Sequence, residues 1–215
     1  MNFKQLCDTV LDLIDDNGYT TEIPVYVNMA YQMAVNEPGV RVPGLKGMSV
    51  VKTAVDTNCV SMLTDNPRFS GKLLRVGDPT KITIYPSLET LFDEYQKDGK
   101  LLDEEGDVEA VALEDTLLWY QAIPATATEL AVIYYSDPPE LVLPSDVPTY
   151  LPAMLHEDLI AYGAAKRLMN RIEDGVEGPK VATSSFETTY QRGVNSLRSW
   201  LAARRTSNNR SAWDV

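Results

Sequence analysis

The chain has 215 residues, of which 44% are hydrophobic and 23% charged, and its formal net charge is −12. This composition is typical of a folded globular protein and argues against wholesale disorder, while the unbroken apolar runs fall far short of the ~20 residues that a membrane-spanning helix needs. A surface this acidic repels phosphate backbones, so sequence-specific binding of nucleic acid is disfavoured.

Two helices are predicted in the N-terminal segment. Apolar residues recur at three- and four-residue spacing over residues 3–14, and Asn2 can cap the start of this helix. A second helix is predicted over residues 22–36, with Thr21 as its N-cap and Pro24 in the first turn, where the missing N–H costs nothing. The short connection between them predicts an antiparallel helical hairpin.

The segment from residue 43 to 137 has a different pattern, with β-branched and alternating residues between turn signals. We predict five or six strands in an antiparallel meander, near residues 50–60, 73–76, 81–85, 108–113, 117–123 and 130–135. The strongest strand is 130–135, and residues 114–115 are the expected turn of a hairpin. A short helix is expected over 88–96, with Ser87 as its cap.

Two long helices are predicted after a proline-rich link that begins near residue 138. The first covers about residues 149–174. The second begins with a capping box formed by Ser184 and Glu187, three residues apart. Residues 206–215 lack any apolar period, and we predict that they form a flexible tail.

Together these elements predict an α+β fold. Residues 1–42 and 138–205 are expected to form a helical bundle core from the N- and C-terminal helix pairs. Residues 43–137 are expected to form a β-rich antiparallel insertion between the two pairs, and residues 206–215 the flexible C-terminal tail.

Side chains suited to catalysis are sparse. Any Ser/His or Cys/His mechanism would have to use His156, the single histidine, which lies off the apolar stripe of its helix and is expected to be exposed or at an interface. Two cysteines are too few for a disulfide framework or a cysteine-rich metal site, and no secretory leader is apparent. The acidic turn at 103–107 could hold a divalent ion only weakly, and residues 44–47 match no phosphate-binding loop. We predict no enzyme, no metal and no cofactor.

Charge is distributed unevenly along the chain. Residues 1–191 carry 14 basic and 30 acidic side chains, whereas residues 192–215 carry five arginines and one aspartate. Trp213 lies in the polar tail, where no core of its own can shield it, and an aromatic side chain beside arginines has the composition of an interface hot spot. The predicted partner-binding residues are Arg204, Arg205, Arg210 and Trp213. The alternative for this end of the chain is simple disorder.

Four stretches of the sequence resemble one protein family. They are Tyr-Tyr-x-Asp-Pro-Pro at 134–139, Leu-Pro-x-Asp at 143–146, the segment 151–164 that includes Leu-His-Glu-Asp-Leu-Ile-Ala-Tyr-Gly-Ala, and Glu-Ile-Pro-Val-Tyr-Val-Asn at 22–28. Together they resemble the head-to-tail adaptor, or connector, proteins of tailed bacteriophages. The segment 43–107 carries no detailed likeness.

The resemblance implies a structural protein of the virion, made in the host cytoplasm and placed in the neck between capsid and tail. Adaptors of this kind form a ring of twelve copies beneath the portal protein, bind tail or nozzle proteins, and send C-terminal segments into the portal. DNA passes through the ring without sequence-specific binding, and no membrane is involved. Carboxylates along such a channel would repel phosphates, which gives the acidic body of the chain a role.

Two other classes of function remain open from the residues alone. One is a phage-associated hydrolase of cell-wall glycans, which would use a carboxylate pair and an aromatic platform. The other is a ligand-binding module built on the β-rich insertion, which would be a monomer with a pocket. A cell-wall hydrolysis assay and a measurement of native mass would separate them from an adaptor.

Overall fold

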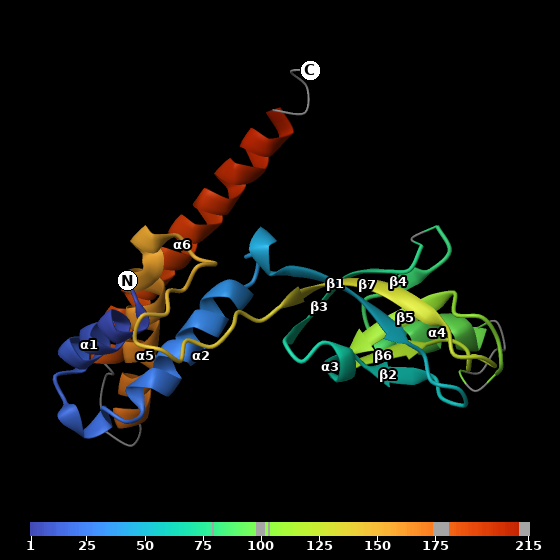
Figure 1. The fold of residues 1–215 in the computed structure, drawn as a ribbon, viewed down its shortest axis with the longest axis horizontal. Coiled ribbons are helices and arrows are strands. Elements are labelled where there is room, and N and C mark those ends of the chain that lie inside the picture. The colour runs from blue at the N-terminus through green and yellow to red at the C-terminus, as the bar shows by residue number, and fades with distance from the viewer. Residues whose placement is uncertain (79, 98–101, 103, 174–180, 211–215) are drawn as a thin grey trace. The chain divides into compact units, whose positions relative to one another are not determined.

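The computed structural model describes residues 1–78, 80–97, 102, 104–173 and 181–210 (Figure 1). Over these residues the chain is a mixed α+β protein with six α-helices and two β-sheets. It divides into two compact units, one made of residues 1–44 and 138–215 and the other of residues 45–137. We call them the helical unit and the β unit.

The helical unit contains α1 (Phe3–Ile14), α2 (Ile23–Asn36), α5 (Tyr162–Ile172) and α6 (Val181–Arg210), with 3₁₀ turns at Asn17–Tyr19 and Ala153–Leu155 and a π-helical turn at Glu157–Ala161. Asn2 caps α1 as predicted, in a capping box in which its Oδ1 accepts from the Gln5 N–H and its N–H donates to Gln5 Oε1, both at 2.9 Å. The N–H of Phe3 donates to the Asp146 carbonyl at 2.7 Å, and the next N–H to the Pro144 carbonyl at 3.1 Å. The segment before α5 therefore closes the start of the first helix.

The start of α2 differs from the prediction in its cap. Pro24 lies in the first turn as predicted, but the residue before the helix is Glu22 and Thr21 does not cap it. The backbone of Glu22 is already helical, with φ −91° and ψ −27°, whereas a side-chain cap requires an extended residue. The Glu22 carboxylate pairs instead with Arg171 of α5.

The helix predicted over residues 149–174 is broken into three pieces: the 3₁₀ turn, the π turn and α5. Pro152 disfavours the helical conformation at Leu151, so the helix cannot begin at residue 149. Pro152 is itself extended, with ψ 134°. The π turn then adds one residue to the winding ahead of α5.

His156 lies between these turns and is buried, so the prediction of an exposed or interface histidine is wrong. The helical angle was taken from an ideal α-helix, and the change from 3₁₀ to π winding shifts its phase. The Leu151 carbonyl can only accept, so Nε2 carries the proton and donates to it at 3.1 Å. Nδ1 then accepts from the main-chain nitrogen of Met1 at 3.1 Å.

Burial lowers the pKa of His156 below its ordinary value of 6.5. Below about pH 6.5 the unfolded chain binds a proton that the folded chain does not, so the free energy of unfolding is expected to fall from pH 7.5 to 5.5. Each unit of difference between the two pKa values contributes about 1.4 kcal/mol. Urea unfolding at several pH values measures this slope. His156→Gln should flatten this dependence on pH, and equal slopes in both proteins would refute the assignment.

The predicted capping box of Ser184 and Glu187 is wrong, because α6 begins three residues before Ser184. The cap comes from a carboxylate outside the helix. Glu173 accepts from the N–H groups of Ala182 and Thr183, both at 3.3 Å, and from Thr183 Oγ1 at 2.6 Å. A negative charge at this end also suits the helix dipole.

At its other end α6 continues through Arg210, so residues 206–210 are helical. Alanine and arginine at 202–205 are strong helix formers, and a formed helix gains one hydrogen bond for each residue that it adds. Thirty residues give α6 a length of about 45 Å. Its last turns extend past the N-terminal end of α5 (Figure 1). Residues 211–215 lie outside the described part of the chain.

The helices of this unit approach one another closely at two glycines. A Cβ on Gly163 would lie 3.1 Å from the Tyr190 ring, and one on Gly193 would lie 2.9 Å from Asp158 Cβ. Tyr190 is fully buried and donates a hydrogen bond to Glu37 at 2.7 Å. Other fully buried side chains of this unit are Leu6, Val10, Val27, Tyr31, Leu159, Ile160, Leu168, Val194 and Leu197.

The β unit contains β1 (Lys46–Lys52), β2 (Cys59–Ser61), α3 (Met62–Asp65), β3 (Phe69–Val76), β4 (Thr83–Tyr85), α4 (Leu88–Lys97), β5 (Ala110–Glu114), β6 (Leu117–Tyr120) and β7 (Glu129–Ser136). A 3₁₀ turn at Pro43–Leu45 precedes β1. The strands form a three-stranded sheet in the order β1-β7-β3 and a four-stranded sheet in the order β2-β6-β5-β4. The predicted single antiparallel meander is therefore wrong, and β4 pairs with β5 in parallel.

The hairpin predicted around residues 114–115 is confirmed by the antiparallel pairing of β5 with β6, and Asp115 takes the left-handed conformation (φ 53°). Ser87 caps α4 as predicted, since its Oγ accepts from the Thr90 N–H at 3.1 Å. The strongest predicted strand became β7, which is the centre of the three-stranded sheet.

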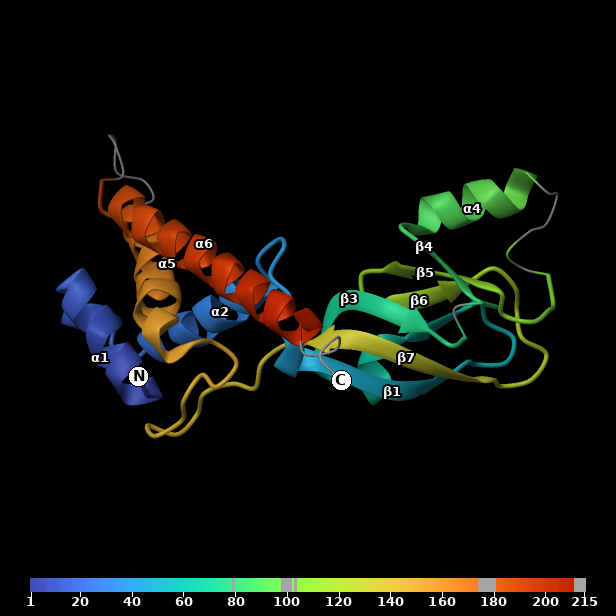
Figure 2. The same cartoon turned by 90° about the horizontal axis from the view of Figure 1, so that it is seen from above.

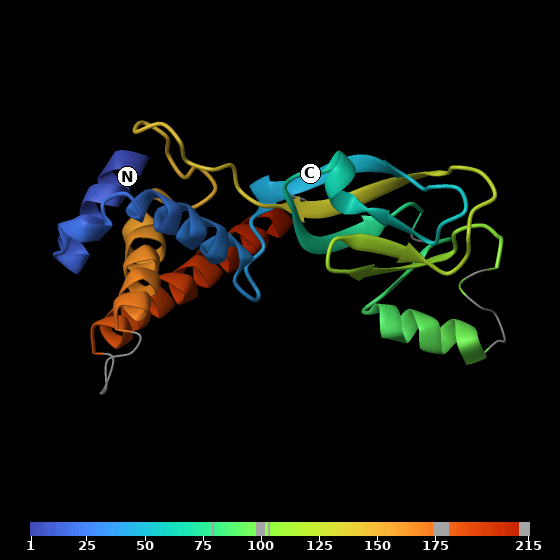
Figure 3. The same ribbon diagram turned by 90° about the horizontal axis from the view of Figure 1, so that it is seen from below.

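The β unit is layered (Figures 2 and 3). The main core lies between the inner faces of the two sheets and consists of Val51, Met62, Phe69, Val76, Val111, Leu118, Tyr120, Leu130, Val132 and Tyr134. The other face of the four-stranded sheet packs against α4, where Leu91 meets Ala110 and Ala112. The three-stranded sheet thus forms one side of the unit and α4 the other.

Candidate functional site

The structure describes the side chain of one of the four predicted partner-binding residues. Arg204 is exposed on α6, and its guanidinium carbon lies over the Trp200 ring, 4.1 Å from the centroid. Arg205 and Arg210 lie in α6 at positions where only the backbone is described. Trp213 lies outside the described residues.

Arg204 and Trp200 line one side of a hollow of about 300 Å³ in the helical unit. Its other walls come from residues 42–44 and 149–152, including the Tyr150 ring. The Trp200 side chain is half-buried. A guanidinium stacked on an indole keeps its N–H groups in a fixed plane, which suits carboxylates and carbonyls. Sequence reasoning missed Trp200, but its i, i+4 spacing from Arg204 was a usable signal.

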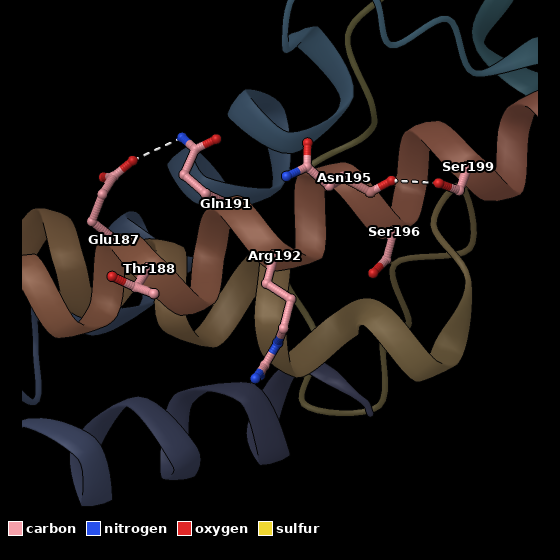
Figure 4. Close-up of a pocket in the computed structure, with 7 residues that line it drawn as sticks. All are labelled: Glu187, Thr188, Gln191, Arg192, Asn195, Ser196 and Ser199. Carbon is pink, nitrogen blue, oxygen red and sulfur yellow. Dashed lines mark hydrogen bonds between the residues drawn. The ribbon is translucent and has the colours of Figure 1, made fainter.

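A second surface of the helical unit is polar and lies along the exposed face of α6 (Figure 4). It is an open hollow lined by Glu187, Thr188, Gln191, Arg192, Asn195, Ser196 and Ser199. Figure 4 shows these side chains on successive turns of one helix, with hydrogen bonds from Gln191 to Glu187 at 2.7 Å and from Ser199 to the Asn195 carbonyl at 3.0 Å. Short polar side chains with spare donors and acceptors suit a hydrated contact.

Besides Arg204, two further C-terminal arginines with described side chains have partners in the helical unit. Arg192 lies 3.4 Å from Asp158, and Arg198 donates to the Pro38 carbonyl at 2.9 Å. Part of the positive charge of residues 192–215 therefore contacts neighbouring segments of the helical unit. The exposed ion pair contributes little free energy of its own because water screens it.

A third surface is apolar. Val142, Leu143 and Val25 are 70%, 60% and 59% exposed, and they lie near a hollow of about 350 Å³ between α2 and residues 140–142. Asn28 fixes this segment, because its Nδ2 donates to the Leu141 carbonyl at 3.0 Å and its Oδ1 accepts from the Leu141 N–H at 2.8 Å. A rigid exposed apolar patch is typical of a protein–protein contact.

The β unit has a hollow of about 130 Å³ beside its acidic turn, lined by Tyr95, Glu104, Glu105, Gly106, Asp107, Glu109, Gln121 and Ala122. This volume lies below the roughly 300–1,000 Å³ of sites that enclose a small molecule. Within the residues described above, no group of three or more His, Cys, Asp or Glu side chains is placed to hold a metal ion. None of the helices in the described part of the chain is long and apolar enough to cross a membrane.

A family model described as SU10 adaptor protein matches residues 1–213, which is nearly the whole chain. No curated protein matches the sequence.

Proposed function

This chain belongs to the SU10 adaptor protein family, a family of phage head-to-tail adaptors, and from that membership we propose that it forms a ring beneath the portal and joins the capsid to the tail. The resemblance stated from the sequence is confirmed, and the family assigns the chain a structural role in the virion. The family match over residues 1–213 is the single observation that carries the proposal.

The proposed ring consists of about twelve copies, each with the helical unit as its core and the β unit, residues 45–137, as an insertion in the chain. A ring requires a heterologous contact, in which two different surfaces of one chain meet on neighbouring copies. The apolar patch at Val25, Val142 and Leu143 and the polar face of α6 differ in chemistry and both belong to the helical unit. The helical unit thus offers its neighbours two different surfaces, which a head-to-tail arrangement requires.

The proposed contact with the portal uses the end of α6. Leu201 is the last buried side chain described on α6, and the next three residues, 202–204, are exposed. Arg204 on Trp200 presents a cation beside a hollow, and Arg205, Arg210 and Trp213 follow in the sequence. Acidic or carbonyl-rich surfaces of the portal are the partners that this chemistry favours.

DNA leaving the capsid would pass through the channel of this ring. The charge of residues 1–191, with 30 acidic against 14 basic side chains, supports a wall that repels phosphates and does not hold them. Tail or nozzle proteins would bind the opposite side of the ring.

Electron microscopy of purified phage particles tests the proposal. The expected image shows density for this chain as a ring between the portal vertex and the tail. The proposal would be overturned if the chain were located in the tail tip or were absent from the particle. In that case turnover of cell-wall glycan by the purified chain would identify the hydrolase named from the sequence, and a ligand-bound monomer would identify a binding module.

A further inference from the structure

One face of the β unit is open. In the three-stranded sheet the inner residues of β1 and β7 enter the core, and the alternate residues point the other way. At the centre of that outer face Met48 and Val50 are 76% and 52% exposed. They pair across the sheet with Ile133 and Ala131 of β7. We call this surface the open sheet face.

Basic residues surround this apolar centre. Lys46 and Lys52 lie at the two ends of β1, on the same face as Met48 and Val50. Lys72 and Arg75 of β3 pair with Tyr135 and Ile133, which belong to the same face of β7. These four are half of the eight lysines and arginines in residues 45–137, a segment that also carries sixteen acidic residues. Glu129, opposite Lys52, is the acidic residue that pairs within this face.

The opposite side of the β unit has the opposite charge. There α4 covers the four-stranded sheet with Leu91, and its outer surface exposes Glu89, Asp93 and Glu94. Figures 2 and 3 show α4 and the three-stranded sheet on opposite sides of the four-stranded sheet. We call the three carboxylates the acidic helix face.

From this arrangement we infer that the open sheet face of one copy docks against the acidic helix face of the next copy. The inference rests on the proposed ring and names a contact that the β units make within it. The charges are complementary, and the two surfaces lie on opposite sides of one unit, so the contact is head-to-tail and can repeat around a closed ring. Covering Met48 and Val50 would remove exposed apolar surface, which adds to the electrostatic attraction.

The basic residues of the open sheet face could also bind the phosphates of duplex DNA. The open sheet face favours protein because its centre is apolar and Glu129 lies among its charges, whereas phosphate contacts call for unopposed cations. The following experiments separate the two.

Cysteine cross-linking within assembled phage particles tests the contact directly. In a background with Cys7→Ser and Cys59→Ser, the chain carries Met48→Cys together with Asp93→Cys, and a short bismaleimide is added. A head-to-tail contact predicts a ladder of covalent multimers, and either cysteine alone predicts monomers. Dimers from Met48→Cys alone would show a symmetric contact and overturn the inference. No ladder from particles that contain the ring would also overturn it, while leaving the proposed function intact.

Charge reversal provides the second test. Lys46→Glu with Lys52→Glu should lower the yield of assembled rings at least about tenfold, and adding Glu89→Lys with Glu94→Lys to the same chain should restore it. Restored ring assembly would indicate docking between copies, because a folding defect caused by the lysine substitutions would not be repaired by substitutions on α4. The inference would be overturned if the variant with all four substitutions still failed to assemble rings. If Lys46→Glu with Lys52→Glu also abolished binding of duplex DNA, the open sheet face would be assigned to DNA.

Discussion

Replacing Tyr190 with alanine is expected to lower the free energy of unfolding of the helical unit by about 3–5 kcal/mol, the usual cost of removing a large buried aromatic ring. The ring is fully buried, it packs on Gly163, and the Lys166 ammonium lies 5.0 Å from its centroid. Burial, together with the hydrogen bond to Glu37, raises the pKa of Tyr190. The phenol therefore stays neutral and keeps donating at every pH at which the protein is handled.

Hydrogen exchange resolved by peptide, with urea unfolding of the full chain, measures the effect on this unit. The matched control is Tyr190→Phe, which keeps the ring and removes only the donor to Glu37. It should cost about 1–2 kcal/mol, the cost of one hydrogen bond and its unpaired carboxylate. If alanine costs no more than phenylalanine, the ring does not organise the packing of α5 and α6.

Removing residues 204–215 is expected to leave the fold intact and to weaken attachment to the portal by about tenfold or more, which corresponds to a loss of at least ~1.4 kcal/mol of binding free energy. Leu201, the last buried side chain described on α6, is retained, so the helical core keeps its contacts. Sedimentation of the purified chain with isolated portal rings measures attachment, and circular dichroism checks the fold.

Two single substitutions sharpen this test. Arg204→Ala removes the cation from the Trp200 ring and should account for part of the loss. Arg192→Ala removes a cation of the same helix that already pairs with Asp158, and it should leave attachment unchanged. Undiminished attachment of the truncated chain, or its failure to fold, would contradict a portal-binding role for the end of α6.

Local signals predicted local structure well. Asn2 and Ser87 act as caps where the sequence placed them, and the turn at 114–115 joins β5 to β6. The predictions failed where residues distant in the sequence determine the pairing of a strand or the cap of a helix. The partners of β7 are β1 and β3, which lie more than 50 residues earlier, and no local pattern shows that pairing. The cap of α6 likewise comes from Glu173, beyond the reach of a three-residue motif.

The interaction surfaces were harder to predict than the elements. Arg204 was identified from charge and composition, but its partner Trp200 was not identified. The apolar patch at Val142 and Leu143 lies in an irregular segment, where periodicity has no meaning. His156 was misplaced because a π turn changes the angle between successive side chains. In each case the backbone path, which the sequence does not display, sets the exposure.

The hydrogen bonds from Phe3 to Asp146 and from the next N–H to Pro144 also set an order of events during synthesis. Residues 45–137 are contiguous, so the β unit can fold as soon as it leaves the ribosome. The first two helices must wait for more than a hundred further residues before the carbonyls that accept from α1 and the partner helices α5 and α6 exist. Until then they expose Leu6, Val10 and Val27 to solvent, and exposed apolar surface of this kind makes a nascent chain prone to aggregation and a substrate for chaperones.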